Sequence, residues 1–218
     1  MPQSVLDPRQ TVASGTAWSP QEPIPVRVRS FGLFPNVDDW LPGDLLLVSP
    51  IHPDWIDRQI CQAQERSGYA PEDALWLHAA AYMGDGYLCE AGTSGVRYVP
   101  VSNYVGEHMI RLRRDPSLTD PERWRLAIQA VVRLGEPYDF LEILSVFKHS
   151  LSTSWTAAFR SQFSRNRRSV ICSQLYADAF MTVTGRLLST NAHAAITPAT
   201  LSLSTRLQDV PLHWKQIV

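Results

Sequence analysis

The spacing of hydrophobic and polar positions divides the chain into a strand-rich first half and a helix-rich second half. Apolar residues recur with a period of two in several short segments, as they do in half-buried strands. A continuous apolar run between prolines, LPGDLLLVSP, predicts a buried strand. The predicted strands lie within residues 26–34 (VRVRSFGLF), 41–50, 75–83, 87–91, 96–101, 108–113 and, at the end of the chain, near 210–218.

Helical spacing replaces this alternation in several other segments. Residues 54–67 have apolar positions on one face, with Asp54 as the expected cap. The clearest helix is TDPERWRLAIQAVVRLG, in which Asp120 is the expected cap, Pro121 occupies the first helical position and Gly135 follows the end. Further helices are predicted in residues 141–162, 171–185 and 197–207. Strands followed by helices predict an α+β fold, with a largely antiparallel sheet packed against helices.

The length of 218 residues suits a single domain. Residues 1–24 are rich in proline, serine, glutamine and threonine, which predicts a flexible N-terminal arm. We therefore expect one domain over residues 25–218, with residues 141–168 as a helical insertion or lid.

Charge and cysteine content narrow the functional classes. The net charge of −1 provides no global field that would attract nucleic acid. No run approaches the roughly 18 apolar residues of a membrane span, and the N-terminus lacks a signal-peptide pattern. Three cysteines are too few for a disulfide framework and lack the paired spacing of a metal site. The five histidines other than His78 also lack metal-ligand spacing. We expect a cytoplasmic protein without metal or cofactor, export by a route that needs no signal peptide being the alternative.

The apolar hairpin WLHAAAYMGDGYLCEAG carries one histidine, His78, and one glutamate, Glu90. A two-residue turn would place Glu90 opposite Ala81, on the other face from His78. A three-residue Gly-Asp-Gly loop would instead place Glu90 opposite Ala80, diagonal to His78 and within hydrogen-bonding reach. The sequence permits both registers. A carboxylate on such a face costs several kcal/mol unless it is paired, so Glu90 is expected to have a partner.

A histidine held by a carboxylate can activate a nucleophile. The candidate is Cys172 in SVICSQLYADAF, at the expected start of a helix, where the helix dipole favours a thiolate. Taken alone, Cys172 is more often a small core residue, and Cys61 and Cys89 are interpreted as core.

The order of four motifs, PGDLLL, LHAAAYMGDGYLCEAGTSGV, PYDF and ICSQLYADAF, resembles that of the circularly permuted papain-like hydrolases. The chain is most similar to their YiiX/YebB-like branch, whose relatives include the NlpC-type cell-wall peptidases and lecithin:retinol acyltransferase. The match covers residues 41–203. It implies a permuted papain-like fold, with the histidine hairpin before the cysteine helix.

The resemblance implies Cys172 as nucleophile, His78 as general base and Glu90 as the residue that orients His78. It also implies that Tyr138 of PYDF lies near the nucleophile as an oxyanion donor, and that Asp44 is structural. The implied activity is a thiol hydrolase acting on an amide or peptide bond through an acyl-enzyme. The alternatives are a lipid acyl hydrolase or acyltransferase, and a non-catalytic binding module on the same fold.

The expected partner is therefore a small-molecule, peptide or lipid substrate in a cleft near Cys172. Nucleic acid is not expected, and peripheral contact with lipid stays open. The expected insertion carries a cluster of basic residues, Arg160, Arg165, Arg167 and Arg168. These arginines either lie on a face exposed to solvent or form a patch that attracts an anionic substrate.

Overall fold

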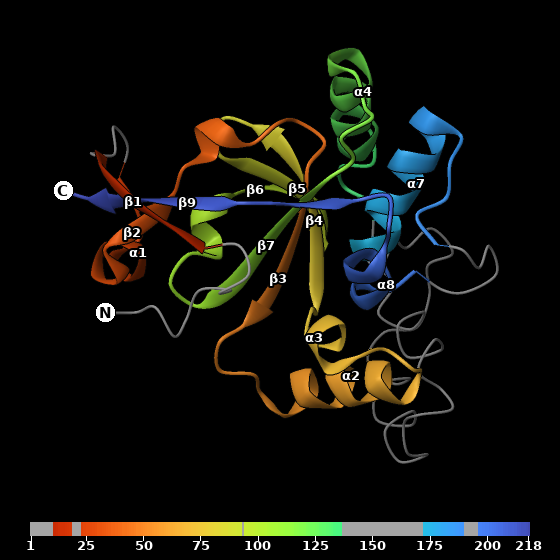
Figure 1. The fold of residues 1–218 in the computed structure, drawn as a ribbon, viewed down its shortest axis with the longest axis horizontal. Helices are drawn as coiled ribbons and strands as arrows, with labels where there is room; N and C mark the ends of the chain where they lie inside the picture. The colour runs from red at the N-terminus through yellow and green to blue at the C-terminus, as the bar shows by residue number, and fades with distance from the viewer. Residues whose placement is uncertain (1–10, 19–22, 93, 137–171, 190–195) are drawn as a thin grey trace.

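A six-stranded antiparallel sheet forms the centre of the protein (Figure 1). The computed structural model describes residues 11–18, 23–92, 94–136, 172–189 and 196–218. The strand order in the sheet is β6-β5-β4-β3-β7-β8. The bounds are Leu45–Pro50 for β3, His78–Gly84 for β4, Tyr87–Gly92 for β5, Gly95–Pro100 for β6, His108–Arg114 for β7 and Gln208–Val210 for β8.

A smaller three-stranded sheet lies beside the first, in the order β1-β9-β2. Strand β9 (Leu212–Ile217) runs parallel to β1 (Thr11–Trp18) and antiparallel to β2 (Leu33–Pro35). Because β9 follows β8 after one residue, the end of the chain passes from one sheet into the other, as the long blue strand of Figure 1 shows.

Six helices surround the sheets in the described part of the chain. Helices α4 and α7 pack together and cover one face of β4 and β5. None of the described helices is long and apolar enough to span a membrane. The bounds are Val26–Phe31 for α1, Trp55–Arg66 for α2, Pro71–Ala74 for α3, Asp120–Val131 for α4, Cys172–Thr184 for α7 and Pro198–Leu203 for α8; short 3-10 turns cover Val37–Asp39 (η2) and Val101–Asn103 (η3).

Both faces of the large sheet are buried, so the domain has two hydrophobic cores. Alternate residues of β3 point into each: Leu45 and Leu47 face α4 and α7, whereas Leu46 and Val48 face the side of the small sheet. This explains why β3 is a continuous apolar run rather than an alternating one. The α+β prediction, with an antiparallel sheet packed against helices, is confirmed.

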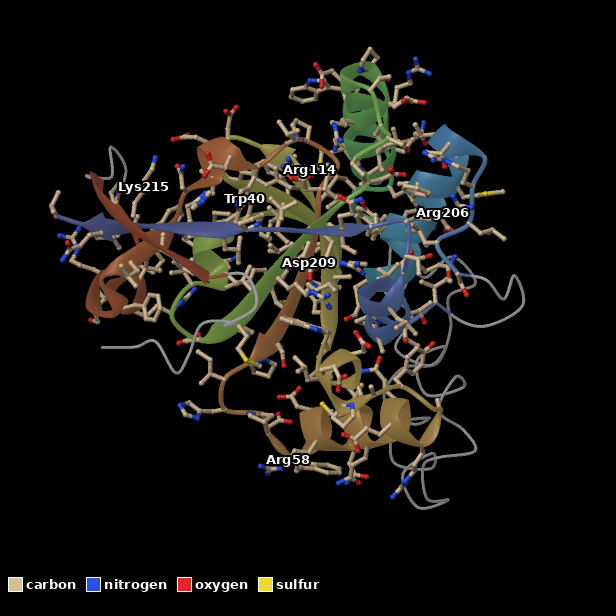
Figure 2. All side chains as sticks on the ribbon, in the orientation of Figure 1. Trp40, Arg58, Arg114, Arg206, Asp209 and Lys215 are labelled. Carbon is tan, nitrogen blue, oxygen red and sulfur yellow. The ribbon has the colours of Figure 1, made fainter. Side chains whose placement is uncertain are left out.

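Asp44 supports the start of β3. Its carboxylate is fully buried and accepts hydrogen bonds from the Leu41 amide at 2.9 Å and from Nε of Arg114 at 2.7 Å. Figure 2 labels Arg114 at this end of the sheet. Burial raises the pKa of Asp44, and the hydrogen bonds from Arg114 and Leu41 oppose that rise. Asp44 therefore ties the loop before β3 to β7.

Three local predictions differ from the structure. Residues 26–31 form helix α1 rather than a strand, because Gly32 ends the segment in a left-handed conformation (φ 79°) and its amide bonds to Val28 O. Residues 11–18, within the predicted flexible arm, form β1 on the edge of β9. The cap of α4 is Thr119 and not Asp120, because Glu122 accepts the Thr119 amide hydrogen at 2.8 Å.

Candidate functional site

The β4–β5 hairpin combines features of the two registers that the sequence permitted. Its turn has two residues, Asp85 (φ 52°) and Gly86 (φ 77°), because Gly84 pairs with Tyr87. Of the two turns that the sequence permitted, the two-residue turn is the one that forms. However, the register shifts between Tyr82 and Gly84, a bulge that gives β4 one extra residue. The shift places Glu90 opposite Ala80, as the pairing of Glu90 with His78 requires.

His78 and Glu90 form a hydrogen-bonded ion pair on one face of the hairpin. Nε2 of His78 lies 2.9 Å from Oε2 of Glu90, whose side chain is only 1% exposed. His78 is the first residue of β4 and its side chain is 21% exposed, so the ring stands at the end of the sheet. With Nε2 bound to Glu90, Nδ1 is the nitrogen left for another partner.

Two further side chains, neither of them predicted from the sequence, hold Glu90. Arg97 of β6 lies directly across from Glu90, and its Nε and Nη2 donate to Oε1 at 2.8 and 2.7 Å. Tyr104, just after η3, donates its hydroxyl hydrogen to Oε2, the oxygen that also meets His78. The cross-strand position of Arg97 could have been found by continuing the hairpin register into β6. Tyr104 had no such signal, because it lies after the 3-10 turn η3, outside the strand register.

Cys172 is the first described residue of α7, and its side chain lies close enough to His78 for each group to shift the pKa of the other. The backbone amides of Ala79 and Ser173 are also near enough to the thiol to lower its pKa. Helix α7 packs on β4, which brings its N-terminal end to the start of the strand that carries His78. The structure thus brings Cys172, His78 and Glu90 together: His78 hydrogen-bonds to Glu90 and lies beside Cys172.

The electrostatics favour charge separation between the cysteine and the histidine. Burial raises the pKa of Cys172, but His78 and the two backbone amides together lower it below its usual value. Burial lowers the pKa of His78, whereas Cys172 and Glu90 raise it, to about 10. Both shifts favour the charged forms of the two groups, a thiolate beside an imidazolium.

Glu90 remains ionised despite its burial. Burial raises its pKa, but the hydrogen bonds from His78, Tyr104 and Arg97 outweigh that effect and hold the pKa at about 2. A charged carboxylate stabilises the protonated form of the histidine and fixes the orientation of its ring.

A cavity of about 360 Å³ opens beside His78 and Glu90. Polar and charged groups on its wall include Asp57, Arg97 and His108, and apolar ones include Ile60 and Leu77. Cys172 is 3% exposed and is not among the residues that line this cavity. The cavity therefore reaches His78 and Glu90, whereas Cys172 lies behind them.

The other predicted residues fall into two groups. Tyr138, the arginine group and residues 141–168 lie outside the described residues. Cys89 is buried on the opposite sheet face from Glu90, and Cys61 lies on α2. Burial raises the pKa of both thiols, to about 12 for Cys89 and about 11 for Cys61, with a further contribution from nearby carboxylates.

These features define an α+β protein with a buried cysteine–histidine–glutamate arrangement at the end of its main sheet. The crystal structure of the metalloprotein YiiX (DUF1105) from Escherichia coli O157:H7 has a similar fold: the TM-score is 0.54 at 17% sequence identity, over 78% of this chain and 96% of that chain. No family model matches the sequence, and no curated protein matches it. The resemblance to YiiX-like proteins is confirmed at the level of the fold.

Proposed function

We propose that the protein is a thiol hydrolase of the permuted papain-like type, which cleaves an amide or peptide bond through an acyl-enzyme. The observation that carries the proposal is the buried His78–Glu90 hydrogen bond beside Cys172, whose pKa is lowered by His78. A cysteine that serves only as a core residue would not have a lowered pKa. A histidine that serves only as a core residue would not be paired with a buried carboxylate. Both features together, at the start of a helix, are what nucleophilic catalysis by a cysteine requires.

In the proposed reaction, the Cys172 thiolate forms a bond to the acyl carbon of the substrate. The C–N bond then breaks, and protonated His78 gives its proton to the leaving amine. Neutral His78 next accepts a proton from water as the water oxygen attacks the acyl-enzyme, which releases the acid and restores the thiolate. Glu90 stays ionised throughout and stabilises the imidazolium at each stage.

Metal chemistry is not part of the proposal, although YiiX is a metalloprotein. Within the described residues, no group of three or more histidine, cysteine, aspartate and glutamate side chains could hold a metal ion. Nε2 of His78 already lies against Glu90, which leaves Nδ1 as its one free nitrogen at this site. The described residues therefore offer no set of ligands for a resident metal here.

The same three residues would serve a lipid acyl hydrolase or acyltransferase, which is the second candidate. The apolar part of the cavity wall, with Ile60 and Leu77, is the observation that favours it. Turnover of peptide amides and of phospholipid esters by the purified chain, each compared with Cys172→Ala, separates the two. We expect amide turnover that the substitution abolishes; ester turnover alone would contradict the amide proposal.

The proposed thiolate can be tested without knowing the substrate. Iodoacetamide at about pH 6 should label Cys172 selectively, because Cys61 and Cys89 have raised pKa values and serve as internal controls. His78→Ala should remove that selectivity. The ultraviolet absorbance of the thiolate, followed during a pH titration, gives the same information independently of reagent access. Equal, slow labelling of all three cysteines, with no thiolate absorbance below pH 8, would overturn the proposal.

A further inference from the structure

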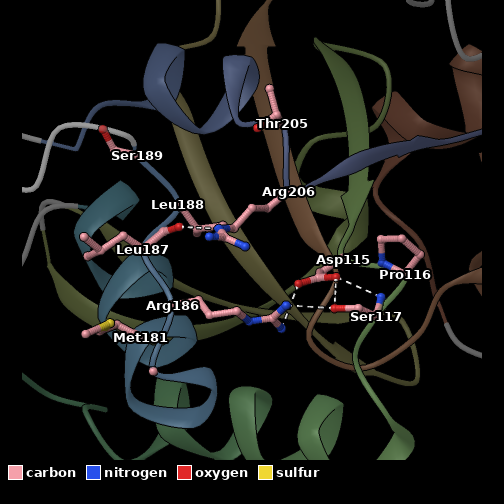
Figure 3. A pocket seen from close by; sticks show the side chains of 11 residues that line it. Asp115, Pro116, Ser117, Met181, Arg186, Leu187, Leu188, Ser189, Thr205 and Arg206 are labelled. Atoms are coloured by element: carbon pink, nitrogen blue, oxygen red, sulfur yellow. Dashed lines mark hydrogen bonds and ion pairs between the residues drawn. The ribbon is translucent and has the colours of Figure 1, made fainter.

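A second and larger cavity, of about 770 Å³, lies at the far end of helix α7 (Figure 3). Its wall comes from the start of the loop after β7, the end of α7 with the residues that follow it, and the loop before β8. Cys172 begins α7, and the 13 residues of the helix place the two ends about 20 Å apart. The cavity is therefore separate from the cysteine site.

Two arginines face this cavity, and only one of them is neutralised. Arg186 lies 3.1 Å from Oδ2 of Asp115, and its Nη1 donates to Oγ of Ser117 at 2.9 Å. Asp115 is 3% exposed, and its other carboxylate oxygen accepts the Ser117 amide and hydroxyl hydrogens. Asp115 is also the one carboxylate among the described residues of the cavity wall. Arg186 and Asp115 together thus carry no net charge.

Arg206 supplies the remaining positive charge. Its Nε donates to the carbonyl of Leu187 at 2.8 Å, which holds the side chain across the cavity wall, as Figure 3 shows. Across the described part of the chain, no acceptor meets its two terminal nitrogens. A guanidinium presents these groups as a flat fork that matches the oxygens of a carboxylate or a phosphate.

The rest of the wall is apolar and incompletely covered. Met181 and Leu187 are each 43% exposed, although both are large hydrophobic side chains. Leu188 and Pro116 extend the same wall. Exposed apolar side chains that gather around a concave surface mark a binding site more often than scattered ones do.

We propose that this cavity binds a small amphipathic anion, in which a carboxylate or phosphate monoester is joined to an apolar chain. Arg206 receives the anionic group, and Met181 and Leu187 contact the chain. Asp115 holds Arg186 in place and limits the net charge of the site to one. This matches a single anionic group rather than a polyphosphate. The proposal is independent of the chemistry of Cys172.

Methionine methyl resonances provide a direct test in the full chain. The sequence has four methionines, of which Met181 lines the cavity, whereas Met83 and Met109 pack against the core between the sheet and the helices. The protein is labelled at the methionine methyl carbons, the Met181 signal is assigned with Met181→Leu, and octanoate is added below its micelle concentration. We expect a saturable shift of the Met181 signal, with Met83 and Met109 unmoved.

The controls separate the head group from the chain. Octanamide has the same chain without the charge, and inorganic phosphate has the charge without the chain; both should bind at least about tenfold more weakly than octanoate. Arg206→Gln should weaken the binding of octanoate by a similar factor. Arg58→Gln should leave the binding of octanoate unchanged, because Arg58 is an exposed residue of α2 remote from the cavity (Figure 2). A Met181 signal that does not shift, equal binding of octanamide or phosphate, or unchanged binding in Arg206→Gln would each overturn the proposal.

Discussion

At the scale of single residues, Glu90 shows how the protein keeps a charge inside a sheet. Burial of a lone carboxylate is expensive, yet Arg97 binds one oxygen of Glu90, and His78 and Tyr104 bind the other. Each donor also fixes the carboxylate in position. The site therefore depends on residues from β4, β5, β6 and the turn that follows η3.

The depressed pKa of Glu90 predicts a specific acid sensitivity. Because the folded pKa is about 2 and the ordinary value is 4.5, the stabilisation is complete above pH 4.5 and is lost as the pH falls through 2. At about 1.4 kcal/mol per unit, it amounts to roughly 3 kcal/mol at neutral pH. Urea unfolding of the wild type and of Glu90→Gln should give stability curves that converge as the pH is lowered from 4.5 to 2. Curves that stay parallel would contradict the prediction.

Tyr104→Phe should destabilise the protein without removing the histidine–glutamate pair. The substitution leaves a buried carboxylate oxygen with one donor fewer, which costs about 1–3 kcal/mol in the free energy of unfolding. Tyr98→Phe is the matched control, because the Tyr98 ring is 49% exposed and stacks on Tyr87. Chemical denaturation of the three proteins measures the difference. An equal effect of both substitutions would show that the Tyr104 hydroxyl does not support Glu90.

At the scale of elements, the β4–β5 hairpin determines which residues share a face. Side chains alternate along a strand, so a shift of one residue would move Glu90 to the face of Cys89. The bulge between Tyr82 and Gly84 prevents this, although the turn has only two residues. The turn itself requires left-handed backbone at both positions, which aspartate and glycine tolerate.

Substitutions at Asp85 test that account of the turn. Asp85 has φ 52°, so Asp85→Val should lower the free energy of unfolding by about 1–2 kcal/mol, since a β-branched residue is strained there. Asp85→Asn should be neutral or slightly stabilising, because asparagine favours this turn. Thermal and urea unfolding of both variants measure the effect. If valine were tolerated as well as asparagine, the turn would not have the conformation described.

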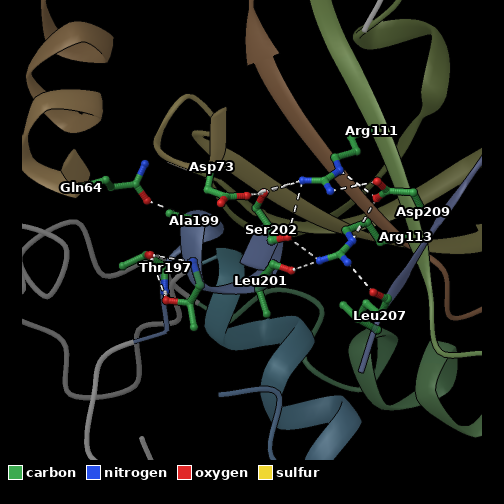
Figure 4. A network of polar contacts seen from close by, with 11 residues as sticks. Gln64, Asp73, Arg111, Arg113, Thr197, Ala199, Leu201, Ser202, Leu207 and Asp209 are labelled. Carbon is green, nitrogen blue, oxygen red and sulfur yellow. Dashed lines mark hydrogen bonds and ion pairs between the residues drawn. The ribbon is translucent and has the colours of Figure 1, made fainter. Parts of the chain in front are cut away.

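Helix α8 is held by buried polar contacts as well as by apolar packing (Figure 4). Nη1 of Arg113 donates to the carbonyl of Leu201, and Nη1 of Arg111 donates to the hydroxyl of Ser202. Asp209 of β8 accepts from Nε of Arg111 at 2.8 Å and lies 3.1 Å from Nε of Arg113. These contacts join α8 to β7 and β8, so the short helix keeps a defined position at the end of the sheet.

At the scale of the whole molecule, the sequence predicted the regular elements better than their connections. The α+β class followed from hydrophobic spacing, which is strong in β4, β5 and α7. The position of Glu90 relative to His78 did not, because the sequence permitted two registers and the bulge in β4 determines which one forms. Helix α1 was not predicted because VRVRS alternates between apolar and polar residues, as a strand does. The one sign of a helix is its end, where Gly32 adopts a left-handed conformation. Arg97 and Tyr104 were missed because their contacts with Glu90 depend on how neighbouring strands and turns pack.

The position of β1 leads to a prediction about the whole domain. Residues 11–18 pair with β9, so their removal would turn the central strand of the small sheet into an exposed edge. A chain that lacks residues 1–18 should have a lower melting temperature and a greater tendency to aggregate. Calorimetry and size-exclusion chromatography measure both. An unchanged melting temperature would mean that this segment contributes no more than the flexible arm expected from its composition.

The bulge in β4 has a consequence for how the hairpin can vary. It lies between the turn and the paired residues Ala80 and Glu90. The bulge, and not the length of the turn, therefore determines which side chains of the two strands share a face. Insertions at the tip, whether they arise by natural variation or carry a peptide tag or a fluorophore, would lengthen the loop without changing which side chains meet. The tip of the hairpin is thus a position where an insertion is tolerated. At the other end of the hairpin, a change in strand register would separate His78 from Glu90.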